Sequence, residues 1–360
     1  MKRIGIVTGG GDCPGLNAVI RAIVKASALR GWETVGIVGG YEGLLPPGNL
    51  LPLDYRTLGN LLTRGGTILG TASRGRFSAK VGHGQSRTLP AELLEETKRG
   101  LKQAGITALI SIGGDGSLSI ALQLFEHGIP IVGVPKTIDN DLEGTLMTFG
   151  FDSAVACATD ALDRLHTTAE SHNRVMVLEV MGRYAGWIAL YSGVAGGADV
   201  VLLPEIPFSY DRISAKIAER EARGRRFSII VAAEGAREQG ADFVTRSSPA
   251  GQGEARLGGI GNLVAAEIER RTSKESRACV LGHLQRGGSP TSFDRLLCSI
   301  FGAEAVERVA AGDFGKMVAY QGGAHIGAVP IAEAVGKLKT VALDGGLARA
   351  ARALGICLGD

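Results

Sequence analysis

Short apolar runs alternate with longer amphipathic segments along most of the chain. Eight runs rich in β-branched residues predict strands at residues 4–7, 34–38, 107–112, 130–134, 175–180, 200–203, 228–233 and 278–281. Five segments with apolar residues near i, i+3 and i+4 predict helices at residues 16–29, 91–103, 152–168, 211–223 and 257–272. Strands that are apolar on both faces indicate a parallel sheet covered by helices on both sides. The pattern therefore predicts an α/β fold whose ligands bind beyond the carboxyl ends of the strands.

The length of the chain predicts two domains, because 360 residues exceed what one hydrophobic core usually holds. Hydrophobic residues make up 45% and charged residues 21%, which excludes a disordered or fibrous protein. The loop 135–152 is a candidate crossing point between the domains. The polar segment 236–256, rich in glycine and serine, indicates a mobile surface excursion.

Charge and cysteine content restrict the partners and the compartment. The net charge of +3, from 39 basic and 36 acidic residues, is too balanced for a protein that coats nucleic acid or a membrane surface. No apolar run approaches the roughly 18 residues that span a bilayer, and the run Ile4–Val7 is too short for a signal peptide. The five cysteines are scattered and lack metal-ligand spacing, which indicates buried thiols in a reducing compartment. We therefore expect a cytoplasmic protein.

The first predicted strand ends in a glycine-rich loop, Thr8–Gly15. Glycines let backbone N–H groups face an anion, and the helix that follows adds its positive end. A tight strand–helix turn is the alternative reading. The loop is not the dinucleotide fingerprint, because Pro14 stands where the third glycine falls and the second strand ends in Gly39-Gly40 rather than in an acid. A Walker-type lysine is also missing, so the loop favours a phosphate group and disfavours NAD-linked chemistry.

A second loop, Ser111–Ser117, follows the strand at residues 107–112. Its glycines supply N–H groups, and Asp115 aims a carboxylate at the same space. A hard oxygen ligand beside phosphates suits Mg²⁺, which keeps most of its waters and bridges phosphate oxygens. The alternative is a glycine turn with Asp115 as a helix cap. The loop indicates a site for a phosphoryl donor.

Two carboxylates, Asp139 and Asp141, follow the strand at residues 130–134. Close to a metal and phosphates, such a pair fits phosphoryl transfer to a hydroxyl group: one acid accepts the proton and the other orients or tunes it. Asp-Asn-Asp is also a common turn composition. The coincidence of three such loops at strand ends favours the functional reading.

Basic residues lie at the ends of two further strands. Arg183 comes after residues 175–180 and a glycine, Arg277 directly precedes residues 278–281, and His283 and Arg286 follow them. Arginine offers a planar fork to phosphate oxygens, so these residues suit a phosphate monoester, although a lone histidine is more often structural. The sequence thus predicts a sugar-phosphate acceptor as well as a phosphoryl donor.

Together these segments resemble the phosphofructokinase family from residue 4 to about residue 300. The matching strings are GIVTGGGDCPGLNAVIR, GGTILGTASR, SIGGDGS, PKTIDNDL, VMVLEVMGRYAGWIAL and VLGHLQRGGSP. The resemblance implies two Rossmann-like three-layer α/β/α domains with mostly parallel sheets. Residues 1–150 plus about 285–335 would bind the phosphoryl donor, and residues 151–284 plus about 336–360 would bind fructose 6-phosphate.

The resemblance also implies roles for single residues. Asp139 matches the catalytic base on the 1-hydroxyl group of fructose 6-phosphate, flanked by Thr137 and Asp141, and Asp115 matches the Mg²⁺ ligand. The matches to the nucleotide site are Gly10, Gly114, Gly116 and Ser117, with Ser73 or the displaced Arg74 at an arginine position. Met181, Gly182, Arg183 and Glu234 match sugar-binding positions, and His283 and Arg286 match positions that bind its phosphate. Arg174 and Arg277 match arginines that are lent across the interface of a homodimer or homotetramer.

Two positions bear on the donor. Lys136 replaces the glycine of typical bacterial ATP enzymes, resembles the pyrophosphate-using branch, and adds positive charge near the transferred phosphoryl group. Gly116 resembles the ATP branch, because an aspartate there would occupy space that the α-phosphate needs. We predict an ATP-dependent 6-phosphofructokinase, with the pyrophosphate-dependent phosphotransferase as the alternative.

Two rival classes lack support from the motifs. NAD and lipid kinases share GGDGS but do not need PKTIDND or GHLQRGGSP. A non-catalytic sugar-phosphate sensor would have lost the acids that this chain retains.

Regulation is expected to be weak: Arg21 and Lys25 are basic, but Tyr55 and His166 stand where regulated bacterial members have arginines. We therefore expect weak or absent control by ADP and phosphoenolpyruvate.

Overall fold

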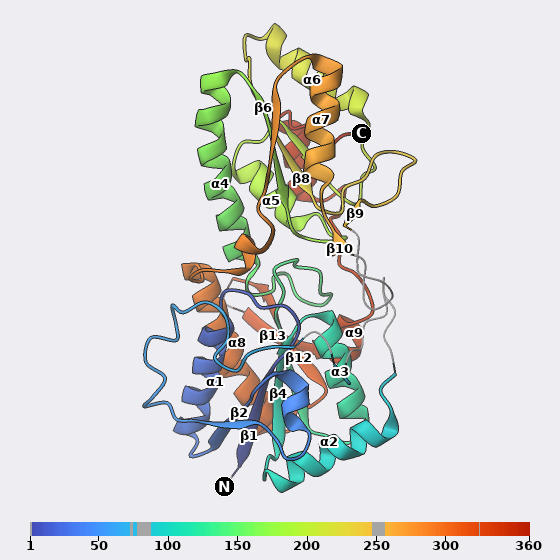
Figure 1. Cartoon of the computed structure of the whole chain (residues 1–360). Helices are drawn as coiled ribbons and strands as arrows, with labels where there is room; N and C mark the ends of the chain where they lie inside the picture. Colours follow the sequence, from blue (N-terminus) through green and yellow to red (C-terminus); the bar gives the residue numbers. More distant parts are fainter. Residues whose placement is uncertain (1, 73–74, 78–87, 247–255, 324) are drawn as a thin grey trace. The chain divides into compact units, whose positions relative to one another are not determined.

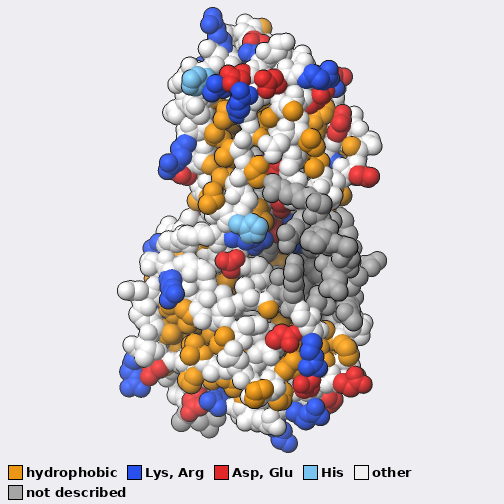
Figure 2. Space-filling model, in the orientation of Figure 1, with side chains coloured by type: hydrophobic (Ala, Val, Ile, Leu, Met, Phe, Trp, Pro, Cys, Tyr) orange, Lys and Arg blue, Asp and Glu red, His pale blue; other side chains and the backbone are white. Residues whose placement is uncertain are grey.

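The computed structural model describes residues 2–72, 75–77, 88–246, 256–323 and 325–360, which fold into two compact units (Figure 1). Unit 1 comprises residues 1–137, 141–153 and 286–338, and unit 2 comprises residues 138–140, 154–285 and 339–360. The donor and acceptor roles expected for the two domains remain predictions. Basic and acidic side chains are interspersed on the visible face of each unit (Figure 2), in keeping with the balanced net charge.

Unit 1 is built on a seven-stranded sheet in the order β13-β12-β5-β4-β1-β2-β3. The five central strands are parallel, and β3 and β13 pair antiparallel at the two edges. Ile4 in β1 lies beside Thr34 of β2 and Ala108 of β4, and the side chain of Ile4 is fully buried. The strand bounds are β1 (Arg3–Thr8), β2 (Glu33–Ile37), β3 (Leu50–Leu53), β4 (Ala108–Gly113), β5 (Ile131–Pro135), β12 (Lys316–Gly322) and β13 (His325–Pro330).

Helices cover both faces of this sheet. The helix α1 (Leu16–Leu29) buries Leu16, Val19, Ile20 and Ile23, one stripe at helical spacing, and packs against α8 (Ser292–Ala311). On the other face, α3 (Asp115–Glu126) packs on β4, β5 and the short α9 (Ile331–Ala334). The helix α2 (Ala91–Gln103) packs against the 3-10 helix η1 (Gly40–Leu44) and contributes to the same core as α3.

Unit 2 contains a four-stranded parallel sheet in the order β11-β6-β8-β7. Its strands are β6 (Val175–Val180), β7 (Val200–Leu202), β8 (Ser228–Ala233) and β11 (Ser276–Val280). The helices α5 (Trp187–Ala195) and α10 (Gly346–Ala353) pack together, with α5 on β7 and β8. The helices α6 (Tyr210–Ala222) and α7 (Ile260–Thr272) pack together, with α7 on β6 and β11.

Three further elements complete the chain. The helix α4 (Phe151–His172) begins in unit 1 and continues in unit 2 (Figure 1). The 3-10 helix η2 (Gly282–Arg286) follows β11, and β9 (Thr245–Arg246) pairs antiparallel with β10 (Arg256–Leu257). Within the described part of the chain, no helix is both long and apolar enough to cross a bilayer.

The eight expected strands and five expected helices are all observed, with ends displaced by a few residues. Several observed helices, among them α5, α8 and α10, were not anticipated. In α5 most side chains are buried, and no polar stripe reveals a helical period. Two further expectations need correction. Only Cys13 and Cys298 are buried, whereas the other three thiols are half-buried. The start of the segment 236–256 is not a free excursion, because the backbone of Phe208 binds it: Phe208 N donates to Arg237 O, and Phe208 O accepts from Gln239 N. Residues 247–255 of this segment lie outside the described residues.

Candidate active site

The two glycine loops of unit 1 follow the adjacent strands β1 and β4, whose connections run to opposite sides of the sheet at a topological switch point. The strand β1 continues through α1 to β2, whereas its neighbour β4 continues through α3 to β5 on the opposite side. The Gly9 N–H group donates to Ile112 O across this point (3.0 Å). Gly10 and Gly15 have φ angles of 76° and 106°, a region that favours glycine, so the loop turns sharply into α1. Such switch points are where open α/β sheets bind their ligands.

Three polar side chains converge on the first glycine loop. Lys136 Nζ donates to Gly11 O (2.5 Å), and Arg286 Nη1 donates to Asp12 O (3.1 Å). A Cβ atom on Gly9 would overlap Ser117 Oγ, and one on Gly11 would lie 2.7 Å from Arg286 Nη1, so a side chain at either position would force its neighbour to shift. Although Lys136 is only 3% exposed, its ammonium group reaches the loop. Two cations and a hydroxyl group therefore surround a loop suited to an anion.

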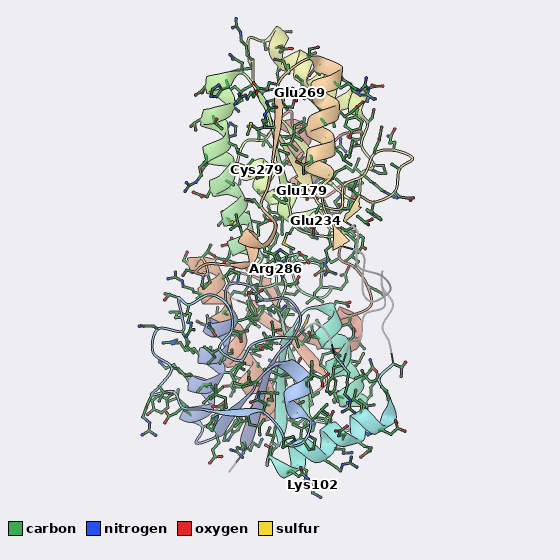
Figure 3. All side chains as sticks on the ribbon, in the orientation of Figure 1. Lys102, Glu179, Glu234, Glu269, Cys279 and Arg286 are labelled. Atoms are coloured by element: carbon green, nitrogen blue, oxygen red, sulfur yellow. The ribbon has the colours of Figure 1, made fainter. Side chains whose placement is uncertain are left out.

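Arg286 thus lies against the donor loop, a contact that its predicted role as a ligand of the sugar phosphate did not anticipate. Figure 3 labels Arg286 at the end of η2. The guanidinium group keeps several further N–H donors while one of them binds Asp12 O, so the role in phosphate binding remains a prediction.

Asp115 begins α3, where the helix presents its positive end. The Asp115 Oδ1 atom accepts from Gly336 N (3.0 Å). Among the described residues, no group of three or more histidine, cysteine or acidic side chains is arranged to hold a metal ion. This donor set fits Mg²⁺ bound by one carboxylate together with substrate phosphates and water, rather than a metal held by the protein alone.

Sequence reasoning missed Tyr41, which fixes the start of α3. The Tyr41 hydroxyl donates to Ser117 O (2.9 Å) and lies 2.6 Å from Ser111 Oγ. Burial raises the pKa of Tyr41, so its hydroxyl stays a donor. Tyr41 follows the glycine pair after β2, and that position was the one signal that could have revealed it.

In unit 2, loops follow the adjacent strands β6 and β8, whose helices α5 and α7 pack on different pairs of strands. Glu234 N donates to Val180 O (2.8 Å), and Arg183 N donates to Glu234 Oε1 (3.2 Å). Arg183 has a φ angle of 49°, uncommon for a side chain of this size. A Cβ atom on Gly235 would overlap the Arg183 carbonyl oxygen. The structure therefore brings the predicted residues Arg183 and Glu234 together in a tightly packed corner.

Asp139 belongs to unit 2 and is 5% exposed. Burial and, next, the charge of Asp139 raise the pKa of Glu234 to about 7. Because like charges disfavour joint ionisation, the two carboxyl groups form an electrostatically coupled pair. The charge of Glu179, which Figure 3 labels together with Glu234, also contributes to this shift. The arrangement offers a carboxylate base and a neighbour that can hold a proton near neutral pH.

Two buried polar residues that were not predicted support this corner. Gln285 is fully buried, and its Oε1 atom accepts from Met181 N (2.8 Å). Glu179 accepts from Gly261 N (2.7 Å) and Gly259 N (2.9 Å), and so caps α7. Gln285 lies inside the GHLQRGGSP string, so the motif itself was the signal. His283, two residues earlier, is exposed.

The segment that carries the acids is divided between the units. Thr137 and Asp141 belong to unit 1, and Thr137 O accepts from Thr148 Oγ1 (2.7 Å). Thr137 is 8% exposed, and Asn140 has a φ angle of 51°. The two candidates for the nucleotide arginine position, Ser73 and Arg74, lie outside the described residues.

Arg174 and Arg277 both pair with Glu275, away from the corner that Arg183 and Glu234 form. Arg174 Nε lies 2.7 Å from Glu275 Oε2, and Arg277 Nη2 lies 2.6 Å from Glu275 Oε1. Both arginines lie at the amino ends of their strands, and the six residues of β6 span roughly 20 Å. Within one chain, Arg174 and Arg277 therefore lie at the opposite end of these strands from Arg183. Their sharing with a second subunit remains a prediction.

The positions expected to bear on regulation are engaged locally. His166 Nε2 lies 2.7 Å from Gly196 O, and Tyr55 is exposed with the Arg56 guanidinium near its ring. Arg21 is half-buried and Lys25 is exposed.

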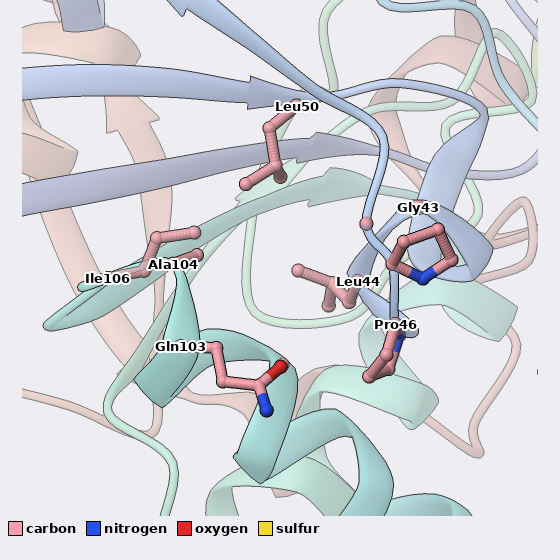
Figure 4. Close-up of a pocket in the computed structure, with 10 residues that line it drawn as sticks. Gly43, Leu44, Pro46, Leu50, Gln103, Ala104 and Ile106 are labelled. Carbon is pink, nitrogen blue, oxygen red and sulfur yellow. The ribbon is translucent and has the colours of Figure 1, made fainter.

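A cavity of about 220 Å³ lies between η1, β3 and the end of α2 (Figure 4). Its lining is mainly apolar, and Gln103 is its polar side chain. None of the predicted site residues lines it, so it is not part of the candidate active site.

Comparisons with known proteins find phosphofructokinases both by sequence and by structure. The family model described as Phosphofructokinase matches residues 3–309. The chain is 53% identical over 359 residues to an ATP-dependent 6-phosphofructokinase of Chloroflexus aurantiacus, covering 100% of this chain and 98% of the relative. It is 50% identical over 345 residues to a pyrophosphate–fructose 6-phosphate 1-phosphotransferase of Amycolatopsis mediterranei, covering 95% and 97%. The solved phosphofructokinase of Saccharomyces cerevisiae superposes with a TM-score of 0.78 at 31% identity, covering 92% of this chain and 45% of that one.

Proposed function

The chain belongs to the phosphofructokinase family, and on that premise we propose that it transfers the terminal phosphoryl group of MgATP to the 1-hydroxyl group of fructose 6-phosphate. The observation that carries the proposal is the buried Asp139, whose charge is coupled to Glu234 beside the fixed Arg183 backbone. A carboxylate base next to phosphate-binding residues is what transfer to an alcohol requires.

In the proposed mechanism, Asp139 accepts the proton of the attacking hydroxyl group. Glu234 anchors the Arg183 backbone, so that the guanidinium group can stabilise the charge that develops on the transferred phosphoryl group. Lys136 and Arg286, both bound to the glycine loop, attract the donor phosphates. Asp115 would hold Mg²⁺, which, when bound, neutralises charge on the phosphates.

The donor is proposed to be ATP because Gly116 leaves room for the α-phosphate, and the relative from Chloroflexus aurantiacus carries the name of an ATP-dependent enzyme. One observation favours pyrophosphate as a second candidate. The Lys136 ammonium group is held at the glycine loop, where it adds charge that the smaller donor needs most. The relative from Amycolatopsis mediterranei is named for pyrophosphate.

The proposal includes a homodimer or homotetramer in which Arg174 and Arg277 bind the sugar phosphate of a neighbouring subunit. Their place at the amino ends of β6 and β11, away from the Asp139 corner, supports this role.

The direct test measures fructose 1,6-bisphosphate formed from fructose 6-phosphate and Mg²⁺, with ATP and with pyrophosphate in parallel. Turnover with ATP alone supports the proposal, turnover with pyrophosphate alone supports the second candidate, and silence with both donors refutes the function. Asp139→Ser is expected to lower kcat by about 10²- to 10⁴-fold while fructose 6-phosphate still binds. Asp163→Ser, at an exposed position of α4, is the matched control.

A further inference from the structure

Lys339, which no motif singled out, contacts the segment that carries the proposed base. Its Nζ atom donates to Asn140 Oδ1 (3.2 Å), one residue from Asp139. The segment Ile138–Asn140 contributes only three residues to unit 2, and Asn140 holds a left-handed conformation. So short a segment cannot form a hydrogen-bonded element of its own. Backbone pairings flank it, Lys136 with Phe149 and Leu142 with Leu338, and the side-chain contact of Asn140 with Lys339 joins it to the rest of unit 2.

Lys339 is itself held at both its backbone and its side chain. The indole Nε1 of Trp187 donates to Lys339 O (2.9 Å), and the Lys339 ammonium lies 5.6 Å from the centroid of the Trp187 ring. An ammonium group over an indole face is attracted by the ring quadrupole, which restricts the long lysine side chain. Lys339 is half-buried, so solvent competes only partly for these contacts.

The chain that follows Lys339 is also tied to the loop that carries Arg183. Glu205 Oε1 accepts from Val341 N (2.8 Å) and from Gly186 N (3.0 Å). Gly186 ends the loop that contains Arg183 and directly precedes α5. Contacts within unit 2 therefore run from Asn140 through Lys339 to the Arg183 loop.

We propose that Lys339 is a positioning residue, which holds Asn140 so that the Asp139 carboxylate keeps its orientation relative to Arg183. This inference rests on the proposed function, because it assigns Asp139 the role of base. Removing the ammonium group leaves the binding groups for both substrates in place but removes the hydrogen bond to Asn140 Oδ1. Misplacement of a catalytic group by about 1 Å can cost 10²-fold in rate, so the loss falls on kcat.

The test compares Lys339→Met, Lys339→Arg and the control Lys102→Met, which removes an exposed lysine in the last turn of α2 (Figure 3). Lys339→Met is expected to lower kcat about 10- to 100-fold and to change KM for either substrate less than about threefold. Lys339→Arg recovers much of the loss, because it keeps a cation that can reach Asn140 and stack on Trp187. If Lys339→Met does not fold, Lys339→Gln, which keeps an N–H donor without the charge, replaces it.

A double-mutant cycle separates positioning from a general structural effect. Asn140→Gly tolerates the left-handed backbone and removes Oδ1. In that background Lys339→Met should lower kcat by a clearly smaller factor than in the unmodified chain, because the contact with Asn140 is already lost. Unchanged kcat in Lys339→Met, or fully additive losses in the cycle, would overturn the inference while the unmodified enzyme remains active. If the unmodified enzyme shows no turnover with either donor, the proposed function is instead refuted.

Discussion

Glu234 makes the stability of unit 2 depend on pH in a direction opposite to that of a salt-bridged acid. Burial and the Asp139 charge raise the pKa of Glu234 from 4.5 to about 7 in the folded chain. In the unfolded chain the group ionises near its ordinary value. Between these two values the unfolded state has lost its proton while the folded state keeps it. Raising the pH through this window therefore favours unfolding.

The size of the effect follows from the shift. A difference of roughly 2.5 in pKa corresponds to about 3 kcal/mol of unfolding free energy. This stability is fully present below pH 4.5, falls as the pH rises to about 7, and stays constant above that. Glu234→Gln removes the ionisable group and keeps a carbonyl oxygen to accept from Arg183 N. The variant is therefore expected to lack this slope.

The two tryptophans allow the measurement to be confined to one unit. Trp187 lies in unit 2 and Trp32 in unit 1, so Trp187 fluorescence in a Trp32→Phe background reports on unit 2. Urea unfolding is followed between pH 4.5 and pH 8, without substrates, for this background and for its Glu234→Gln derivative. The stability of the derivative relative to the background should rise by about 3 kcal/mol across that range.

Parallel curves would refute the reasoning. A relative stability that changes by less than about 0.5 kcal/mol would mean that Glu234 ionises in the folded chain as it does in the unfolded one. The coupling to Asp139 would then be absent, and with it the electrostatic argument for the acid pair.

Three further predictions concern activity. Gly235→Ala would force the Arg183 carbonyl oxygen away and lower kcat/KM about 10- to 100-fold in steady-state kinetics, whereas Gly346→Ala, with open space around its Cβ, would not. Asp115→Asn should raise the Mg²⁺ concentration needed for half-maximal rate at least about tenfold, because a neutral amide binds the hard ion less well; an unchanged Mg²⁺ titration would exclude Asp115 as a ligand. Phosphoenolpyruvate at millimolar concentration should leave the rate nearly unchanged, and strong inhibition would show that an effector site persists despite the two replaced basic positions.

The alternation of strands and helices, and the edge at which the site residues lie, could be predicted from the sequence. A strand such as β8 is recognised from the five apolar residues that follow Ser228, because side-chain period and β-branching are properties of neighbours along the chain. Since the parallel strands of a sheet end at one edge, residues that follow them could be assigned to the ligand-binding edge of their own sheet before any coordinates, such as Asp115 in unit 1 and Arg183 in unit 2. Helices buried on most faces, such as α5, carry no such period.

The partners of the site residues could be decided only by the tertiary structure. Asp139 and Glu234 are distant in sequence, and the coupling that raises the pKa of Glu234 depends on their separation and on exclusion of water. The contact of Arg286 with Asp12 likewise joins residues 274 positions apart, and that of Lys339 with Asn140 joins residues 199 positions apart. By itself the sequence determined the α/β architecture, the residue types of the site and the family motifs that they form. Only the folded chain decided which charges meet and how deeply they are buried, because Coulomb and desolvation energies depend on distances in space rather than along the chain.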